Sequence, residues 1–320
     1  MTSRAPAVSR SPRRRWPGPV TACLTLIVAL ALGGCGQPGA GTEAAPPADD
    51  GRLQVAASFY PIEYAVSQVG GPHVQVTTLT KAGAEPHSLE LTPKDVETIS
   101  SMDLVVYSAG FQAAVDRAVE QVTPESALDV SPAAQLDLDA AAHDHDGDLD
   151  PHFWLDPTKY AAIGPAIADR LADLDPQHAD EYQRHAAAFT DSMTDLDAEF
   201  AAGLRTCESR TLVTSHAAFG YLAARYDLTQ VPIAGLSPDQ EPSARELADI
   251  AATVKAEGVR SIYAEILVDT DFARTIAEST GTSVATLDPV AGITNKSKGS
   301  DYLEVMRANL ATLQVGQGCS

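Results

Sequence analysis

The chain has 320 residues, a formal net charge of −21 at pH 7 and a hydrophobic content of 44%. This length is sufficient for two folded units, each with a hydrophobic core of its own. The large acidic excess argues against a nucleic-acid-binding protein and against adhesion to anionic lipid, because both need a basic surface.

The first 34 residues are typical of a bacterial export signal. Five arginines lie within the first 15 residues, and the apolar run that follows, Val20 to Leu32, is too short to span a bilayer. The run ends in Leu-Gly-Gly-Cys, which resembles a lipoprotein cleavage box. We therefore expect Cys35 to become a lipidated N-terminus that anchors the protein on the extracytoplasmic face of the cell membrane. The alternative is an ordinary secretory signal with an incidental cysteine.

The composition of residues 35–51 predicts a flexible tether. They are rich in Gly, Ala, Pro and Asp, and this composition cannot form a core. No later stretch approaches about 18 consecutive apolar residues, so the remainder is expected to be a soluble body. Because residues 1–34 contain five arginines and no acidic residue, their removal would change the formal net charge from −21 to −26.

Residues 52–174 predict a first α/β lobe. Short apolar runs alternate with helical patterns, which indicates a mostly parallel sheet flanked by helices. The expected strands are 53–57, 74–79 and 104–107, and the expected helices are 64–69, 93–100, 113–122 and 157–174. The acidic stretch 137–150 contains His143 and His145, has no periodicity and predicts a mobile loop.

Residues 175–205 predict one long linking helix, which would begin at Pro176 and end at Leu204. Apolar residues recur there at steps of four and three and form a single stripe, namely Tyr182, Ala186, Phe189, Met193, Leu196, Phe200 and Leu204. At 1.5 Å per residue such a helix is roughly 40 Å long, which is enough to cross a domain.

Residues 206–320 predict a second α/β lobe. The expected strands are 211–214, 228–233, 261–264 and 283–287, and the expected helices are 217–226, 243–256, 271–279 and 301–315. The predicted fold is therefore two lobes, each with a mostly parallel sheet flanked by helices, joined by one long helix. We expect a monomer.

Four cysteines are present, and two of them remain after processing. Cys23 leaves with the signal and Cys35 would carry lipid, so Cys207 and Cys319 are expected to pair in an oxidising compartment. Closing a loop of more than a hundred residues stabilises a protein by at most about 4–5 kcal/mol on the chain-entropy estimate. A thiolate metal site is the alternative, but it would need further Cys or His nearby, and neither flank offers one.

Four candidate metal ligands follow predicted strands or precede a helix, where open parallel sheets bind their ligands. They are His87, His152, His216 and Asp288, two in each predicted lobe. Three imidazoles and one carboxylate suit zinc in tetrahedral geometry, whereas a manganese site would be expected to replace imidazole by carboxylate. Taken singly, a histidine at a strand end is more often a capping or hydrogen-bonding residue.

Four segments resemble the ZnuA/TroA-like lipoproteins, the zinc and manganese receptors of bacterial ABC importers. The segments are AGAEPHSLELTPKDV, DPHFWLDP, TLVTSHAAFGYLAARYDL and ATLDPVAGI, and the resemblance runs from about residue 53 to 316. It implies a helix-linked fold that binds one divalent metal between its lobes and delivers it to an ABC permease and, through it, to the ATPase. Carried over by position, His87 and His152 are ligands from the first lobe, and His216 and Asp288 are ligands from the second.

The resemblance favours the zinc branch, because the manganese branch typically has Glu at the position of His216. Zinc receptors also carry a His-rich acidic loop, which here is reduced to His143 and His145. These two are expected to collect metal weakly or simply to be solvated. Glu265 ends a strand and is expected to hydrogen-bond a ligand, to replace one, or to be only a strand-end carboxylate. Glu85 and Glu90 flank His87 and would orient its second ring nitrogen.

Two other classes of function compete with a receptor. A zinc hydrolase needs an open coordination position, and four ligands would close the site. A surface adhesin or a metal-storage lipoprotein is compatible with an anchored acidic body, but adhesion needs an exposed apolar patch and storage needs several metal sites. We therefore expect a zinc receptor that catalyses no reaction, with a manganese receptor of the same family as the nearest alternative.

Overall fold

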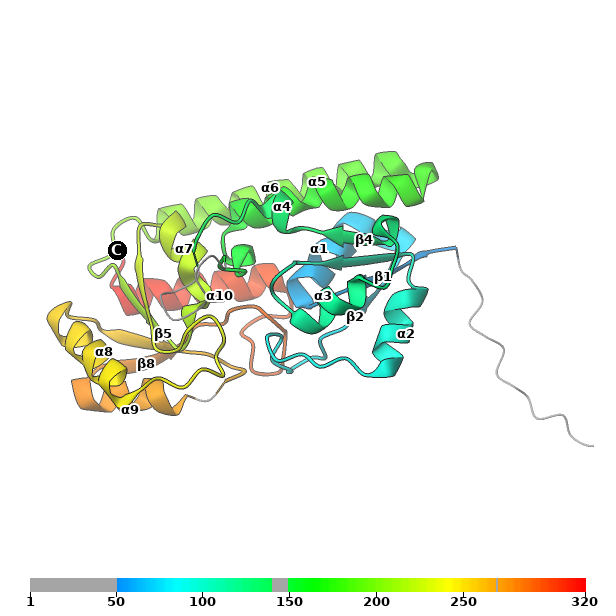
Figure 1. Ribbon diagram of the computed structural model, residues 1–320. Helices are drawn as coiled ribbons and strands as arrows, with labels where there is room; N and C mark the ends of the chain where they lie inside the picture. Colours follow the sequence, from blue (N-terminus) through cyan, green and yellow to red (C-terminus); the bar gives the residue numbers. More distant parts are fainter. Residues whose placement is uncertain (1–50, 140–148, 269) are drawn as a thin grey trace, which may run out of the picture. The chain divides into compact units, whose positions relative to one another are not determined.

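In the computed structural model, two four-stranded parallel sheets form the scaffold of the protein (Figure 1). The structure describes residues 51–139, 149–268 and 270–320. The predicted signal, the lipidated Cys35, almost all of the tether, and His143 and His145 lie outside the described residues. Within the described part of the chain, no helix combines the length and the hydropathy that crossing a bilayer requires.

The first sheet has the strand order β2-β1-β3-β4. Its strands are β1 (Leu53–Ala57), β2 (Val74–Thr78), β3 (Leu104–Tyr107) and β4 (Ala127–Asp129). The helices of this lobe are α1 (Tyr60–Gly70), α2 (Pro93–Ser101), α3 (Ala113–Val119) and the short α4 (Ser131–Ala134). The parallel order confirms the predicted sheet, and it brings the carboxyl ends of β1, β2 and β3 to one edge.

The strand β4 was not predicted from the sequence. It has only three residues, all of them half-buried, and Leu128 is its one large apolar side chain. It forms because its backbone completes the edge of the sheet, where Val105 pairs with Ala127 and Tyr107 pairs with Asp129. Helix α1 also begins four residues before the predicted start, since Pro61 occupies its first turn without loss of a helical hydrogen bond.

The second sheet has the strand order β6-β5-β7-β8. Its strands are β5 (Thr211–Thr214), β6 (Thr229–Pro232), β7 (Ser261–Ala264) and β8 (Ser283–Thr286). The helices of this half are α7 (Gly220–Arg225), α8 (Ala244–Ala256), α9 (Asp271–Thr280) and α10 (Tyr302–Gln317). The helix predicted over 217–226 begins with a 3-10 turn, and α7 follows that turn.

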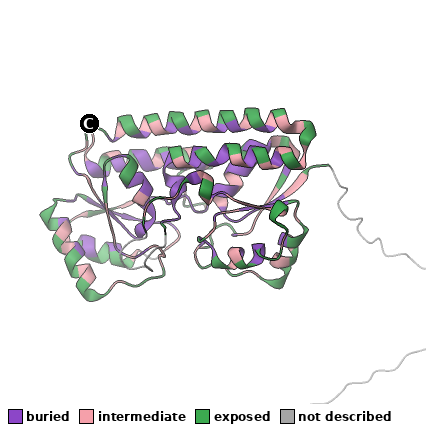
Figure 2. Cartoon of the chain, turned by 45° about the horizontal axis from the view of Figure 1, so that its top comes forward, coloured by how far each residue is buried: buried purple, intermediate pink, exposed green. Residues whose placement is uncertain are grey.

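Helices α5 (Pro157–Leu174) and α6 (Ala179–Gly203) pack side by side along both halves (Figure 1). The predicted apolar stripe of α6 is buried, and the opposite face of the helix is exposed (Figure 2). The helices approach closely at Gly164, where an added Cβ would lie 2.9 Å from the ring of Phe189. A 3-10 turn over Pro176–His178 replaces the first turn that the sequence predicted for α6.

The two sheets share a hydrophobic core on one face of each, and the opposite faces have separate buried clusters. A continuous cluster of buried apolar side chains includes Val55 of β1, Leu212 of β5 and residues of α5, α6 and α10. Helix α10 also reaches the first lobe, because the ring of Tyr302 lies 5.5 Å from that of Tyr64 and 4.5 Å from that of Tyr160. The helix predicted to end the second lobe therefore packs on both lobes.

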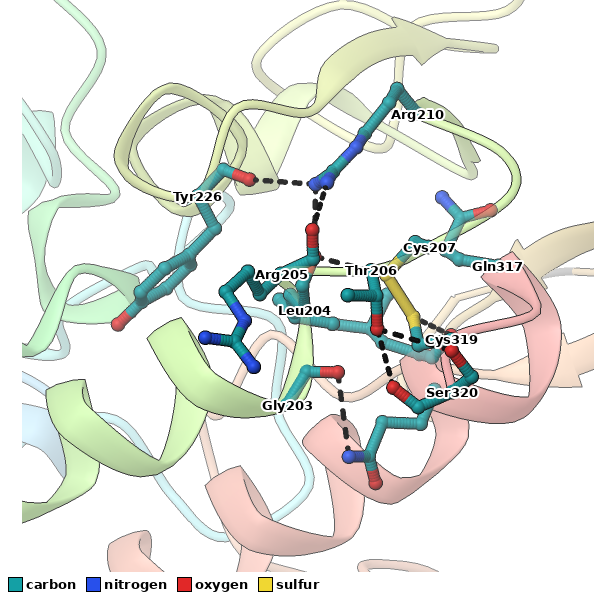
Figure 3. The surroundings of a disulfide bond; sticks show 12 residues. Gly203, Leu204, Arg205, Thr206, Cys207, Arg210, Tyr226, Gln317, Cys319 and Ser320 are labelled. Carbon is teal, nitrogen blue, oxygen red and sulfur yellow. Dashed lines mark hydrogen bonds between the residues drawn. A yellow bond between two sulfur atoms is a disulfide. The ribbon is translucent and has the colours of Figure 1, made fainter.

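A disulfide joins Cys207, after α6, to Cys319, after α10 (Figure 3). The flanking backbone is paired as well, since the N–H of Ser209 donates to the carbonyl of Gln317. The bond lies before the amino end of β5, whereas His216 follows its carboxyl end. The disulfide and the histidine are thus at opposite ends of the strand.

We expect Cys319→Ser to lower the free energy of unfolding by about 2–4 kcal/mol, because it removes the constraint that a 112-residue separation places on the unfolded chain. Urea denaturation under oxidising conditions measures this loss. Cys207→Ser and the double variant should give the same loss, since either change breaks the bond. A reducing agent that destabilises Cys319→Ser as strongly as the parent protein would contradict this explanation.

Candidate metal centre

Three of the four predicted ligands meet in one place. His87 lies in the loop between β2 and α2, His152 precedes α5, and His216 directly follows β5. One ring nitrogen from each lies within 4.8 Å of the other two, and Nε2 of His87 is 3.1 Å from Nε2 of His152. His152 and His216 are buried, while His87 is half-buried. The structure therefore brings together histidines that are up to 129 positions apart in the sequence.

Buried carboxylates orient two of these imidazoles in the same way. Asp150 Oδ1 accepts the backbone N–H of His152 at 2.9 Å and lies 2.8 Å from its Nδ1. Glu265 Oε1 accepts the backbone N–H of His216 at 3.2 Å and lies 2.6 Å from its Nδ1. Burial raises the pKa of Asp150 to about 7, but its Oδ1, like Oε1 of Glu265, already accepts a backbone N–H. Each of these oxygens therefore acts as an acceptor for the ring as well, and each Nδ1 carries the proton. Each Nε2 then presents a lone pair that can bind a metal.

The electrostatic environment keeps two of the imidazoles neutral. Burial, with smaller contributions from the neighbouring His152 and His216, lowers the pKa of His87 to about 2. Burial, together with His216, also holds the pKa of His152 well below its usual range. Neutral imidazole is the form that binds metal. For His216, burial acts to lower the pKa, but the charge and the hydrogen bond of Glu265 outweigh it and raise the pKa.

Asp288, the fourth predicted ligand, lies outside the group of three histidines whose ring nitrogens are within 4.8 Å. Its side chain is buried. Oδ1 accepts the N–H of Val290 at 2.8 Å, whereas Oδ2 accepts no hydrogen bond from the described residues. Burial and, less strongly, the nearby Glu265 raise the pKa of Asp288 to about 6. Asn309 fixes the backbone, since it accepts from the N–H of Asp288 and donates to its carbonyl.

The remaining acidic residues differ in what they contact. Glu85 accepts the backbone N–H of His87 at 3.0 Å and therefore holds the peptide rather than the ring. Within the described residues, no hydrogen bond joins Glu90 to His87. Asp150 was not identified from the sequence, although the pattern of an aspartate two residues before a histidine was visible in DPHFWLDP. This spacing lets one carboxylate reach both the backbone and the ring of His152.

Aromatic side chains form one wall of the centre. The ring of Phe111 meets that of His87 edge-on at 4.6 Å, and the ring of Trp154 lies 5.2 Å from that of His152. Beside His87 is a cavity of about 520 Å³, which Phe111 lines from the first lobe and Leu236 and Gln240 line from the second. Of the three histidines, His87 is the one that lines this cavity.

Comparison with known proteins decides the family. The family model described as "ZnuA: Zinc-uptake complex component A periplasmic" matches residues 55–316. The chain belongs to the ZnuA family. This match confirms the resemblance noted in the sequence, and the family is one of solute receptors rather than enzymes.

Relatives of known name cover most of the chain. The zinc-binding protein AdcA of Streptococcus pyogenes serotype M6 is 33% identical over 297 residues, which cover 86% of this chain and 58% of AdcA. The chain therefore spans little more than half the length of that relative. The high-affinity zinc uptake system protein ZnuA of Bacillus subtilis is 31% identical over 317 residues, which cover 94% of this chain and 97% of that protein.

A solved structure shows the same two-lobed fold. The laminin-binding protein Lmb of Streptococcus agalactiae matches with a TM-score of 0.74 and 36% identity, over 83% of this chain and 99% of Lmb. Lmb is described as a bifunctional protein with adhesin and metal transporting activity. This similarity confirms the predicted α/β architecture.

Proposed function

We propose that this chain is the extracytoplasmic receptor of a zinc importer, and that it binds one Zn(II) and delivers it to an ABC permease driven by its ATPase. The observation that carries the proposal is the convergence of three imidazole nitrogens within 4.8 Å. Imidazole is a preferred zinc ligand, and two such nitrogens bound to one tetrahedral zinc are about 3.4 Å apart. The 3.1 Å between the Nε2 atoms of His87 and His152 is close to that separation.

We propose Asp288 as the fourth zinc ligand. Its Oδ2 is buried and accepts no hydrogen bond from the described residues, so a metal would supply the missing positive partner. Binding would draw this carboxylate and the three imidazoles together, two ligands from each lobe. Glu265 and Asp150 would act indirectly, through the imidazoles that they orient.

This ligand set favours a zinc receptor over the alternatives. Manganese prefers more oxygen ligands than three imidazoles leave available. A hydrolase needs an open position for water, which Asp288 would close. Storage needs several sites, and the described residues contain one group of this kind. The adhesin activity named for Lmb belongs to that protein, and no observation in the described part of this chain favours it.

The proposed receptor is a monomer that is tethered to the membrane. Lipidation of Cys35 would hold it there, and residues 36–51 would give it reach. Two lobes that share a core and two long helices allow only modest movement between them. Release would therefore require the permease to draw the ligands of one lobe away from those of the other.

Metal stoichiometry and competition test the proposal. The full-length chain, purified in detergent without unfolding, is analysed for bound metals by mass spectrometry and is then titrated with zinc against a chelator and against excess manganese. We expect one zinc per chain, retained in the presence of manganese. Two or more metals per chain, or manganese retained against excess zinc, would overturn the assignment.

A further inference from the structure

The loop that carries His87 is held to the rest of the protein by few hydrogen bonds. Most of the described hydrogen bonds of residues 81–91 close short turns within the loop. One example runs from the N–H of Leu89 to the carbonyl of Pro86. Two hydrogen bonds reach this stretch from elsewhere in the described protein. One joins His87 to His152, and the other comes from Gln112 to the carbonyl of Pro86.

The side chain of Gln112 is buried and makes two directed contacts. Its Nε2 donates to Oγ1 of Thr80 at 2.9 Å and to the carbonyl of Pro86 at 3.1 Å. The hydroxyl of Thr80 donates its own hydrogen to the carbonyl of Ser58 at 2.8 Å. Both partners of Nε2 are therefore acceptors, which excludes the flipped amide and fixes the orientation of Gln112.

Gln112 contacts the backbone next to His87, and the adjacent Phe111 contacts the His87 side chain. Gln112 fixes the peptide that precedes His87, while the ring of Phe111 contacts the imidazole. When zinc binds, the Nε2 atoms of His87 and His152 must both turn to the metal, so the hydrogen bond between them is lost. Gln112 then provides the one remaining hydrogen bond that reaches the His87 loop from elsewhere in the described residues.

We propose that Gln112 is a positioning residue for metal capture, and that it sets the affinity for zinc by holding the backbone of the His87 loop. His152 and His216 have carboxylates that orient their rings, whereas Glu85 contacts only the backbone N–H of His87. The position of His87 thus depends on its loop, and the loop depends on Gln112. This inference rests on the proposed zinc-binding function.

The test is a double-mutant cycle on the full-length chain with zinc as the ligand. Gln112→Met keeps the length of the side chain and removes both donors. We expect it to weaken zinc binding by about 10–100-fold, the range found when an outer partner of a metal ligand is lost. In a His87→Ala background the same change should alter zinc affinity by no more than about twofold, because its target is absent.

Gln317→Met is the matched control. Gln317 is also buried, and its Nε2 donates to the carbonyl of Thr211 at 3.1 Å. The Oε1 atoms of Gln112 and Gln317 both lack a hydrogen-bond partner among the described residues. We expect this control to lose stability yet to keep the zinc affinity of the parent. Cobalt substitution adds a spectroscopic readout, since Gln112→Met should change the visible absorption of bound Co(II) and Gln317→Met should not.

Three results would overturn the inference. They are an unchanged zinc affinity in Gln112→Met, an equal loss in the His87→Ala background, and an equal loss in Gln317→Met. These outcomes are distinct from failure of the proposed function, in which the parent protein itself would bind no zinc. If the parent protein binds zinc and one of the three results is found, only the proposal about Gln112 has failed.

Discussion

Replacing His216 by alanine is expected to weaken zinc binding by at least about 100-fold, the upper end of the loss seen when only an outer partner of a ligand is removed. The change deletes an imidazole of the three-histidine group, and it leaves the buried Glu265 without the ring that it orients. Chelator competition measures the affinity directly. Thermal unfolding gives a second measure, because zinc at 100 times its dissociation constant stabilises the parent by about 2.7 kcal/mol.

His185→Ala is the control for His216→Ala. His185 is half-buried on α6, where its Nδ1 lies 3.0 Å from the carbonyl of Val69, and it belongs to no ligand group. Its removal should leave zinc affinity unchanged. If His216→Ala still binds one zinc within about tenfold of the parent affinity, below the loss expected for even an outer partner, then His216 is not a ligand.

Trp154→Ala is expected to lower the free energy of unfolding by about 3–5 kcal/mol, as large-to-small changes of buried aromatic residues do. The ring is fully buried and packs against Phe59 and Phe111 at centroid distances of 4.8 and 5.3 Å. Its indole N–H donates to the carbonyl of Pro289 at 2.8 Å, which links the two lobes next to Asp288. Far-UV circular dichroism during urea denaturation measures the loss.

Trp154→Phe separates packing from the hydrogen bond. It keeps most of the ring but leaves the carbonyl of Pro289 without its donor, and we expect a loss of about 1–3 kcal/mol. A loss equal to that of Trp154→Ala would assign the whole effect to the hydrogen bond. A loss below about 1 kcal/mol in Trp154→Ala would show that the lobes do not depend on this contact.

The sequence predicted the alternation of strands and helices because apolar periodicity is a local property. The stripe on α6 is an example, since its step of four and three residues is visible without any knowledge of the fold. Strand β4 is the opposite case. Its three residues form a strand because they pair with Val105 and its neighbours in β3. This pairing depends on residues outside the segment, so the local sequence does not indicate it.

The candidate site was predictable in part, because the position of a residue after a strand is also a local property of the sequence. The ends of the preceding strands place His87 and His216 at the correct edges of their sheets. How far a side chain extends into the site, however, depends on the backbone turn that carries it. After Asp288, Val290 has a left-handed backbone with φ of 56°, and its N–H turns back to Oδ1 of Asp288. β-branched residues rarely adopt this conformation, so it could not be predicted from the residue types.

The disulfide has a further consequence if the protein is the extracytoplasmic receptor proposed above, because proteases act in that compartment. The bond closes a ring that contains every strand of the second sheet, from β5 to β8. A single cut in the exposed segment Asp239–Glu241 would separate His216 from Asp288 in sequence but not in space. The two fragments would remain covalently joined, and the nicked chain would separate into two bands on a gel only after reduction.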